Sequence, residues 1–512
     1  MRSSRYWPLR WVYGASYGAL LLWLVVRLRR LPEIGLLELR RPRGDHCFGS
    51  SDLDLRAQTQ RMTATEYFGL CDRLADVLRP QKRWLKILDL HLVGPEEMKL
   101  QQRLGQISFG DSRWIRLFGE RSANGGPPQK LNGALCRAMY EYGYICQELF
   151  ERRFDIHSTR SLYRRVTRVD EEFRALASLD ERGSELRSQV MSIARSIIAK
   201  GRLRVAQSEE LESVFALAVC ELDAIARSSS APAATDCDFS PTAESVAPVN
   251  LDRAVASCSI AINKLCHENS KLLLGAMMGG VPGTAFDHRI YLILRDGVGV
   301  NELLEIHRAI RSTYAAANSS SRIPNTYLRL RHPTVLTPEL WRASSHWYHA
   351  LRPVEEYYLL RRHGVVLWGQ DLRGELTPPT NSDVTFSVAI AATDLRHIIW
   401  ESIHDRRPKQ LADALLGRIP ALWLLLSQSR VATSSGEALV GCAASGFFEI
   451  EVLRELYDGI VEVPPEKLPQ TDDPIWKPAL QSASVWLDQV VTMAAERIER
   501  IEAVLNTPSY ER

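Results

Sequence analysis

The stretch "RGDHCFGSSDLDL", residues 43–55, places two aspartates one residue apart, directly after a turn-forming Gly-Ser-Ser. Successive side chains of a strand point to opposite faces, so Asp52 and Asp54 on a strand share one face. Neighbouring carboxylates raise each other's pKa unless a cation lies between them, and such oxygen ligands suit Mg²⁺. The pattern predicts a metal-holding strand. The alternative is a solvated strand end that follows a turn.

A second apolar strand with one acid is predicted further along the chain. In "WLKILDLHLV", residues 84–93, Asp89 is the sole acidic residue of an alternating apolar run. A charge in such a strand is costly without a partner. We therefore expect Asp89 to join Asp52 and Asp54 as a third oxygen ligand. His91 shares the strand face of Asp89, but it has no partner at ligand spacing and is interpreted as structural.

Length and composition indicate a globular protein of several domains. The chain has 512 residues, of which 45% are hydrophobic and 24% charged, with a net charge of +3. This length predicts roughly two to four domains. Nine cysteines without a Cys-x-x-Cys pair argue against a disulfide framework or a zinc site and favour a cytoplasmic location.

The N-terminal segment is apolar and basic. Its apolar run, residues 11–26, is shorter than the roughly 20 residues of a spanning helix and contains two glycines. We therefore expect a buried domain helix and no membrane partner. Nine arginines face only Glu33 and Glu38 in this region, which suits either phosphates and nucleic acid or a solvated face. The arginines are Arg2, Arg5, Arg10, Arg27, Arg29, Arg30, Arg40, Arg41 and Arg43.

The chain reads as two diverged copies of one arrangement. A linker rich in Ser, Ala, Pro and Thr, residues 228–250, separates the halves. Five segments of the first half have counterparts in the same order in the second, which favours a tandem duplication. The predicted domains are a mixed helix-and-strand domain at 1–128, a helical domain at 129–227, the linker, a second mixed domain at 251–378 and a second helical domain at 379–512.

Residues 43–55, followed by a helix and then the strand of Asp89, resemble the DNA polymerase β-type nucleotidyltransferase superfamily. The nearest likeness is to bacterial aminoglycoside nucleotidyltransferase-like proteins. The resemblance implies an α/β (α+β) nucleotidyltransferase-like domain with a mixed sheet, followed by an all-α helical domain. With the duplication, this arrangement is expected twice.

The resemblance also implies a reaction. Asp52, Asp54 and Asp89 would hold two Mg²⁺ ions around ATP or another nucleoside triphosphate, with Asp89 alternatively acting as the base. The expected activity is transfer of a nucleoside monophosphate, AMP in the first instance, to a hydroxyl of a small-molecule acceptor. The residues implied to contact the nucleotide are Arg40, Arg43, Gly44, Gly49, Ser50 and Ser51.

This sequence departs from the family pattern in both halves. Leu39 and Arg40 stand where the family has Gly-Ser. Arg40, Arg41 and Arg43 are expected to compensate by binding phosphate. The second half keeps Asp287 but has Arg289 and Arg329 at the places assigned to Asp54 and Asp89. We therefore interpret the second half as a degenerate copy and the chain as an intramolecular pseudo-dimer.

Two alternatives remain open on the sequence alone. The replaced Gly-Ser pair favours a non-catalytic nucleotide-binding or regulatory protein, in which both copies have lost chemistry. The arginine-rich N-terminus favours an RNA-modifying nucleotidyltransferase, with nucleic acid as the less favoured partner. The three acids favour the enzyme that acts on a small molecule.

Overall fold

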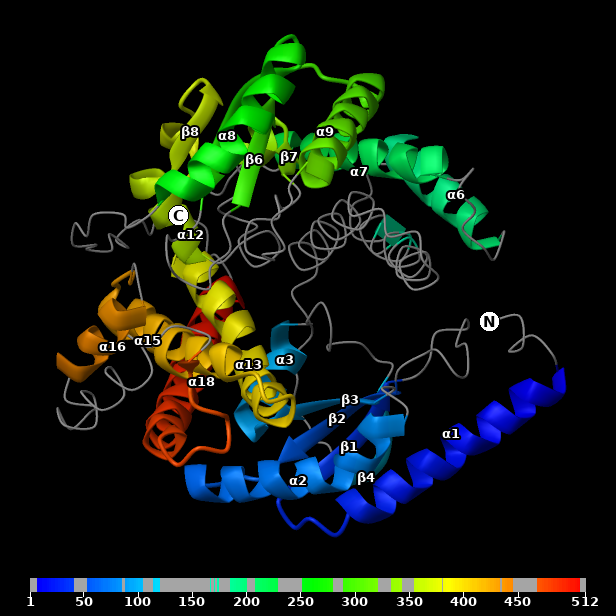
Figure 1. Cartoon of the computed structure of the whole chain (residues 1–512), viewed down its shortest axis with the longest axis vertical. Helices are drawn as coiled ribbons and strands as arrows, with labels where there is room; N and C mark the ends of the chain where they lie inside the picture. The colour runs from blue at the N-terminus through cyan, green and yellow to red at the C-terminus, as the bar shows by residue number, and fades with distance from the viewer. Residues whose placement is uncertain are drawn as a thin grey trace. The chain divides into compact units, whose positions relative to one another are not determined.

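Strands rich in apolar residues build two separate four-stranded sheets, and each sheet belongs to its own compact unit (Figure 1). The structure is a computed structural model of the chain. The first unit comprises residues 1–128 and 388–512, and the second comprises residues 129–387. The residues described are 7–40, 53–84, 88–104, 114–119, 166, 170, 173–174, 185–199, 208–228, 251–279, 289–320, 333–342, 354–379, 381–432, 435–444 and 467–506.

The sheet of the first unit is mixed. Its strands are β1 (Ile34–Arg40), β2 (Leu53–Thr59), β3 (Leu88–Val93) and β4 (Trp114–Gly119), in the order β3-β2-β1-β4. β1 is antiparallel to β2 and β4, while β2 is parallel to β3. A parallel pair needs a crossover connection, which α2 (Ala64–Trp84) provides.

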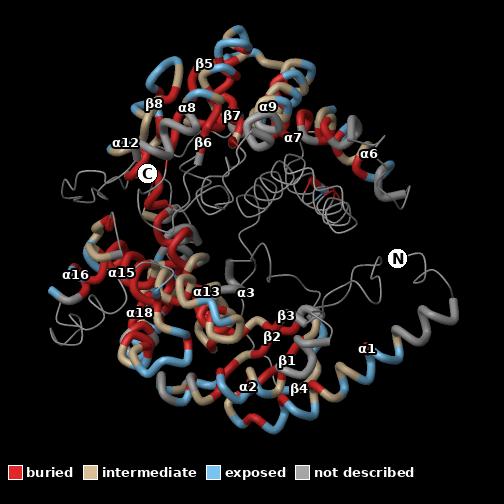
Figure 2. Tube along the Cα trace, in the orientation of Figure 1, coloured by how far each residue is buried: buried red, intermediate tan, exposed pale blue. Residues whose placement is uncertain are grey.

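One face of this sheet is apolar and forms the core of the unit. Leu55, Ala57, Leu90 and Leu92 alternate along β2 and β3 and are buried (Figure 2). Helices α1 (Trp7–Leu28) and α2 contact each other and lie along one side of the sheet (Figure 1). The residues between them, Arg56 and His91 included, lie on the opposite face.

The start of α2 is set by a reciprocal cap. Thr63 precedes the helix, and Glu66 follows three residues later. The Thr63 backbone N–H donates to Glu66 Oε2 over 2.7 Å, and the Glu66 N–H donates to Thr63 Oγ1 over 3.3 Å. Two otherwise unsatisfied donors at the helix N-terminus are thereby paired. The backbone N–H and the hydroxyl of Thr63 both donate to the Glu66 carboxylate, and these hydrogen bonds lower the pKa of Glu66.

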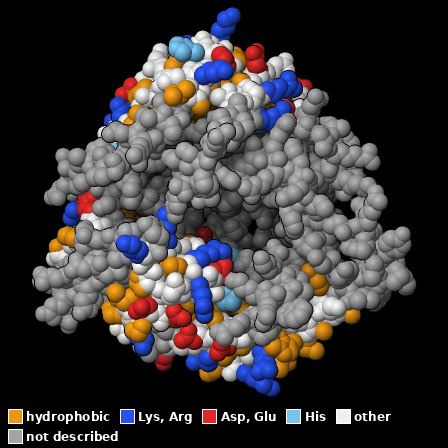
Figure 3. Space-filling model, viewed as in Figure 1, with side chains coloured by type: hydrophobic (Ala, Val, Ile, Leu, Met, Phe, Trp, Pro, Cys, Tyr) orange, Lys and Arg blue, Asp and Glu red, His pale blue; other side chains and the backbone are white. Residues whose placement is uncertain are grey.

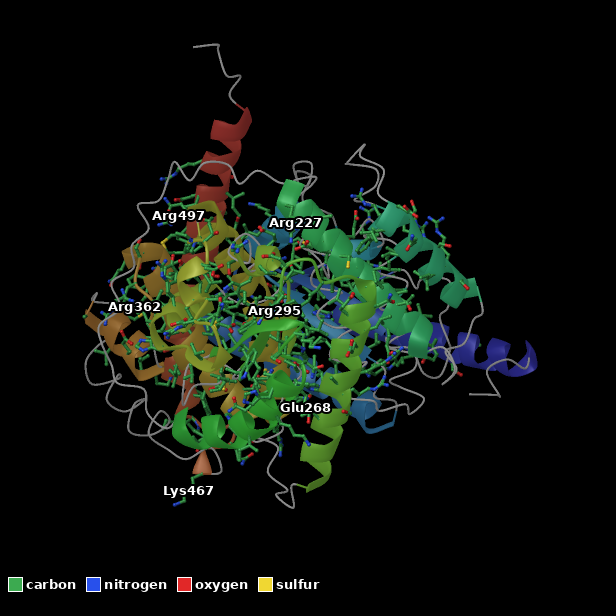
Figure 4. All side chains as sticks on the ribbon, turned by 90° about the horizontal axis from the view of Figure 1, so that it is seen from above. Arg227, Glu268, Arg295, Arg362, Lys467 and Arg497 are labelled. Carbon is green, nitrogen blue, oxygen red and sulfur yellow. The ribbon has the colours of Figure 1, made fainter. Side chains whose placement is uncertain are left out.

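C-terminal helices complete the first unit. They are α13 (Asn381–His404, within the unit from residue 388), α14 (Pro408–Ala412), a π-helical turn η6 (Asp413–Arg418), α15 (Ile419–Gln428), α16 (Ser435–Ala444) and α18 (Trp476–Asn506). α18 packs against α15, α2 and α3 (Pro95–Leu104). Arg497 of α18 donates to the Leu426 carbonyl in the last turn of α15 over 2.5 Å (Figure 4).

A buried arginine ties this helical part to the sheet part. Arg396 of α13 donates to Glu97 Oε1 of α3 over 2.7 Å and to Asp488 Oδ1 of α18 over 2.8 Å. Its guanidinium also lies 5.2 Å from the ring centre of Tyr67 on α2, whose hydroxyl donates to the Arg396 carbonyl. Four helices therefore meet at one guanidinium.

The second unit repeats the strand order of the first. Its sheet comprises β5 (Leu273–Gly279), β6 (Arg289–Leu294), β7 (Thr334–Leu336) and β8 (Val365–Gly369), in the order β7-β6-β5-β8. The pair β5–β6 and the pair β5–β8 are antiparallel, and β6–β7 is parallel. The helices around this sheet are α8 (Leu251–Glu268), α9 (Val300–Ser320), α10 (Pro338–Arg342), α12 (Val354–His363) and the 3₁₀ turn η5 (Arg373–Glu375).

The two sheets also end alike. The last residues of β4 and β8, Gly119 and Gly369, have φ angles of 83° and 75°. A Cβ at Gly119 would lie 2.0 Å from the Gly35 carbonyl oxygen, and one at Gly369 would lie 2.4 Å from that of Leu274. Both strands thus use glycine where the neighbouring backbone passes closest.

Helices from the first half of the chain complete the second unit. α6 (Glu185–Ala199) and α7 (Ser208–Ser228) are joined by a buried ion pair between Arg187 and Glu221 at 2.7 Å. α7 packs against α9 and α10. Its last turn carries Arg227, which pairs with Asp223 one turn earlier (Figure 4). The linear order of the predicted domains gives no sign of this pairing of helices with the second sheet.

The apolar N-terminal run does form a helix, α1, as expected. Leu24 and Leu28 are fully buried, but Leu22 and Val26 are exposed, so only part of the helix surface lies in the core. No described helix, α1 included, has the length and apolar character needed to cross a membrane.

Candidate active site

The backbone places two of the predicted metal ligands at one register position. Asp54 on β2 and Asp89 on β3 are Cα partners in the parallel pair. Paired positions of adjacent strands share a face and lie about 5 Å apart. The two residues are therefore neighbours on the face opposite the apolar core. Their side chains lie outside what the structure describes.

Most other predicted site residues cannot be placed. Arg40 is the last residue of β1 and is paired with Trp114 of β4. Asp52, Arg43, Gly44, Gly49, Ser50 and Ser51 lie outside the described residues. Among the side chains that are described, no group of three metal-ligating residues occurs, and the three aspartates are not among those side chains. Their metal-binding role stays a prediction.

A buried ion pair lies on the same face, next to Asp54. Glu38 of β1 and Arg56 of β2 are paired in register, and Arg56 is two residues beyond Asp54. Arg56 donates to Glu38 Oε2 from Nε at 3.0 Å and from a terminal nitrogen at 2.5 Å. Both side chains are almost completely buried. Residue spacing does not predict this pair, although Glu38 is, like Asp89, the sole acid of an apolar strand.

Glu38→Gln should destabilise the protein by about 3–5 kcal/mol, because it leaves the buried Arg56 without its counter-charge. Urea unfolding would measure this change. The control is Glu33→Gln. Glu33 lies just before β1 and pairs with Arg73 of α2, and this pair is more exposed than that of Glu38 and Arg56. Its loss should cost less than about 1 kcal/mol. Replacing both partners by apolar residues, Glu38→Met with Arg56→Leu, should recover most of the loss. Equal costs for Glu38→Gln and Glu33→Gln would contradict the prediction.

Helix α13 brings a histidine and a carboxyl to this face. The ring of His397 lies 4.0 Å from that of His91, centre to centre, at an interplanar angle of 34°. His91 stands two residues after Asp89 and so shares its face. Burial raises the pKa of Asp394, one turn before His397, to about 6, while the nearby charge of His91 acts in the opposite direction. Sequence spacing cannot reveal that His397 and Asp394 lie near His91, because α13 is distant from β3 in the chain.

Asp394 should make stability depend on pH. Its pKa rises from 3.8 to about 6 on folding, so between these values the folded state holds a proton that the unfolded state has lost. The free energy of unfolding should therefore fall as pH rises from about 4 to about 6, by at most about 3 kcal/mol from this group. Urea unfolding of Asp394→Asn should lack this contribution. Identical pH dependence in the wild type and the variant would contradict it.

The corresponding face of the second sheet lacks these acids. The common register places Arg289 at the position of Asp54, Tyr291 at that of Arg56 and Met277 at that of Glu38. The Tyr291 hydroxyl instead donates to Glu356 Oε1 of α12 over 2.5 Å.

The residue assigned from the sequence to the place of Asp89, Arg329, lies outside the described residues. The described part of the second sheet matches β7 to β3 further on: Thr334 of β7 pairs with Tyr291 as His91 of β3 pairs with Arg56, so Thr334 matches His91.

Comparison of the whole chain with protein-family models, curated proteins and solved structures gave no match.

Proposed function

We propose that the first unit is a metal-dependent nucleotidyltransferase that moves a nucleoside monophosphate, AMP from ATP in the first instance, onto a hydroxyl of a small molecule. The observation that carries this proposal is the register pairing of Asp54 with Asp89 on adjacent parallel strands. Two carboxylates at paired positions repel each other unless a cation separates them. A purely structural sheet face gains nothing from that arrangement.

The donor set fits magnesium. Asp54 and Asp89, with Asp52 two residues before Asp54, would offer only carboxylate oxygens, which Mg²⁺ prefers over nitrogen or sulfur ligands. When bound, two such ions would offset the negative charge of a nucleoside triphosphate and of the leaving pyrophosphate. In this proposal Arg40 and Arg43 contact the phosphates, and Gly44, Gly49, Ser50 and Ser51 form the turn beside them.

α13 forms a wall of the proposed site. The contact of His397 with His91 holds this helix against the face that carries Asp54 and Asp89. Arg396, between Asp394 and His397, anchors the helix to α3 and α18.

We further propose that the two units derive from a tandem duplication. The shared strand order, strand directions and terminal glycines support it. The second copy has Arg289 where the first has Asp54, so it takes the role of a non-catalytic partner in an intramolecular pseudo-dimer.

Nucleotide binding and pyrophosphate release test the activity. The wild-type protein should bind a labelled nucleoside triphosphate in equilibrium dialysis with Mg²⁺ and lose it when EDTA is added. Pyrophosphate should appear when a panel of hydroxyl-bearing small molecules, such as aminoglycosides and sugars, is supplied. Failure to bind any nucleotide in the presence of Mg²⁺ would refute the proposal.

The main competing function is a non-catalytic nucleotide-binding regulator. It is favoured by Leu39 and Arg40 at the place of the family's Gly-Ser pair. Mg²⁺-dependent binding without pyrophosphate release from any acceptor would support it. Salt-sensitive binding of RNA together with nucleotide transfer to RNA would instead support an RNA-modifying enzyme.

A further inference from the structure

Helix α1 carries an apolar row that the fold leaves in water. Leu22 is 66% exposed and Val26, one turn later, is 45% exposed, whereas Tyr17, Leu24 and Leu28 are buried. The helix is therefore held by one face and presents large aliphatic side chains on the other. Figure 3 shows hydrophobic side chains gathered over α1.

Positive charge adjoins this row without any acid. Arg27, Arg29 and Arg30 are exposed at the end of α1, where Figure 3 shows a cluster of basic side chains. Neither aspartate nor glutamate occurs before Glu33. Among the described residues, none forms an ion pair with these arginines. Leu22, Val26, Arg27, Arg29 and Arg30 are called the α1 surface below.

The matching helix of the second unit has a different outer face. Ile260 of α8 is also exposed, at 77%. One turn later comes Lys264 rather than an aliphatic residue. Its Nζ lies 3.9 Å from Oε1 of Glu268, so the two side chains form an ion pair. The shared architecture thus does not require an aliphatic and uniformly basic surface. Of these two helices, only α1 has that combination in the part of the chain that the structure describes.

We propose that the α1 surface binds the surface of an anionic lipid bilayer. Aliphatic side chains that enter the boundary between headgroups and acyl chains, flanked by arginines that meet anionic headgroups, make an interfacial helix. Trp23, whose ring centre lies 5.5 Å from the Arg27 guanidinium, adds a residue type that favours this boundary. A second copy of the chain is disfavoured, because a two-fold contact would bring the arginines of both copies into one interface to which α1 contributes no acid. Leu22 and Val26 also offer nucleic acid no base stacking.

Vesicle co-sedimentation of the full chain tests this proposal. The protein should bind vesicles of phosphatidylcholine with about one-third phosphatidylglycerol, and salt should weaken that binding. Arg29→Glu with Arg30→Glu should lower the partition coefficient at least about thirtyfold. Leu22→Ser with Val26→Ser should lower it at least about tenfold. Since all four residues are exposed, the thermal unfolding midpoints should stay unchanged.

Ile260→Ser, the same kind of change at a still more exposed aliphatic residue of α8, is the matched control and should leave vesicle binding unaltered. Equal binding to neutral and anionic vesicles would overturn the proposal, as would equal losses in Ile260→Ser and the Leu22 and Val26 variant. Sedimentation velocity that shows a dimer lost in the Leu22 and Val26 variant, without vesicle binding by the wild type, would assign the α1 surface to a second copy. RNA binding lost in the Arg29 and Arg30 variant, again without vesicle binding, would assign it to nucleic acid.

Discussion

Asp54→Asn is expected to reduce Mg²⁺-dependent pyrophosphate release at least about a thousandfold, and Asp89→Asn should act alike. Removing one preorganised group that stabilises transition-state charge, such as an oxyanion-hole donor, typically costs about a hundredfold to a thousandfold. In the proposed site Asp54 and Asp89 hold the same cations, since they occupy one register position on β2 and β3. An amide keeps the shape of the side chain but supplies no negative charge to a cation.

Stability offers a second measurement that needs no acceptor. Without metal, two carboxylates at paired positions destabilise the fold, so Asp54→Asn should unfold at the same temperature as the wild type or higher. Added Mg²⁺ should raise the unfolding temperature of the wild type, because it binds only the folded state, and should do so much less in the variant. An equal Mg²⁺ response in both proteins would contradict the assignment of Asp54 as a ligand.

Two further variants serve as controls for the activity. Asp72→Asn introduces the same chemical change on the exposed side of α2. Asp287→Asn removes the aspartate of the second copy, whose neighbour at the position of Asp54 is Arg289. Both should retain full pyrophosphate release. Loss of release in Asp287→Asn, with release retained in Asp54→Asn, would move the active site to the second unit.

The strands of the site could be predicted because their signals are local. Alternation of apolar residues around Asp54 and Asp89 indicated strands, and a parallel pair joined by a helix brings two such strands together. The match of β7 to β3 could not be read from residue counts. The segment between β6 and β7 is longer than the one between β2 and β3, and residue counting does not show where extra residues enter.

The partners of the site could not be predicted, because they join distant parts of the chain. Arg56 meets Glu38 across two strands, and His91 meets His397 from a helix that follows the second sheet. The pairing of Arg56 with Glu38 depends on the register of β2 against β1, which residue spacing does not give. The contact of His91 with His397 depends on how a helix from the second half of the chain packs in the first unit. The same reason hid the role of Arg396.

Arg396→Met is expected to destabilise the first unit by about 3–5 kcal/mol, measured as the free energy of urea unfolding. Methionine fills a similar volume but leaves the carboxylate of Glu97, which is 2% exposed, without its counter-charge. Asp488 is 59% exposed and can turn to water, so most of the cost should come from Glu97. The neighbouring pair of Arg61 and Glu96 provides the control. It joins α3 at the surface, with Arg61 82% exposed, so Arg61→Met should cause no measurable change.

A double variant separates the charge of Arg396 from its packing. If the cost arises from a stranded carboxylate, Glu97→Leu added to Arg396→Met should recover most of the lost stability, because a buried ion pair contributes little beyond an apolar pair of similar volume. If the double variant is as unstable as Arg396→Met alone, the contact of the guanidinium with the Tyr67 ring holds α13 in place instead.

In either case α13 is held less firmly in Arg396→Met, and His397 moves with it. Binding of nucleotide should therefore weaken in Arg396→Met even under conditions where the chain remains folded, and unchanged nucleotide affinity would remove α13 from the proposed site.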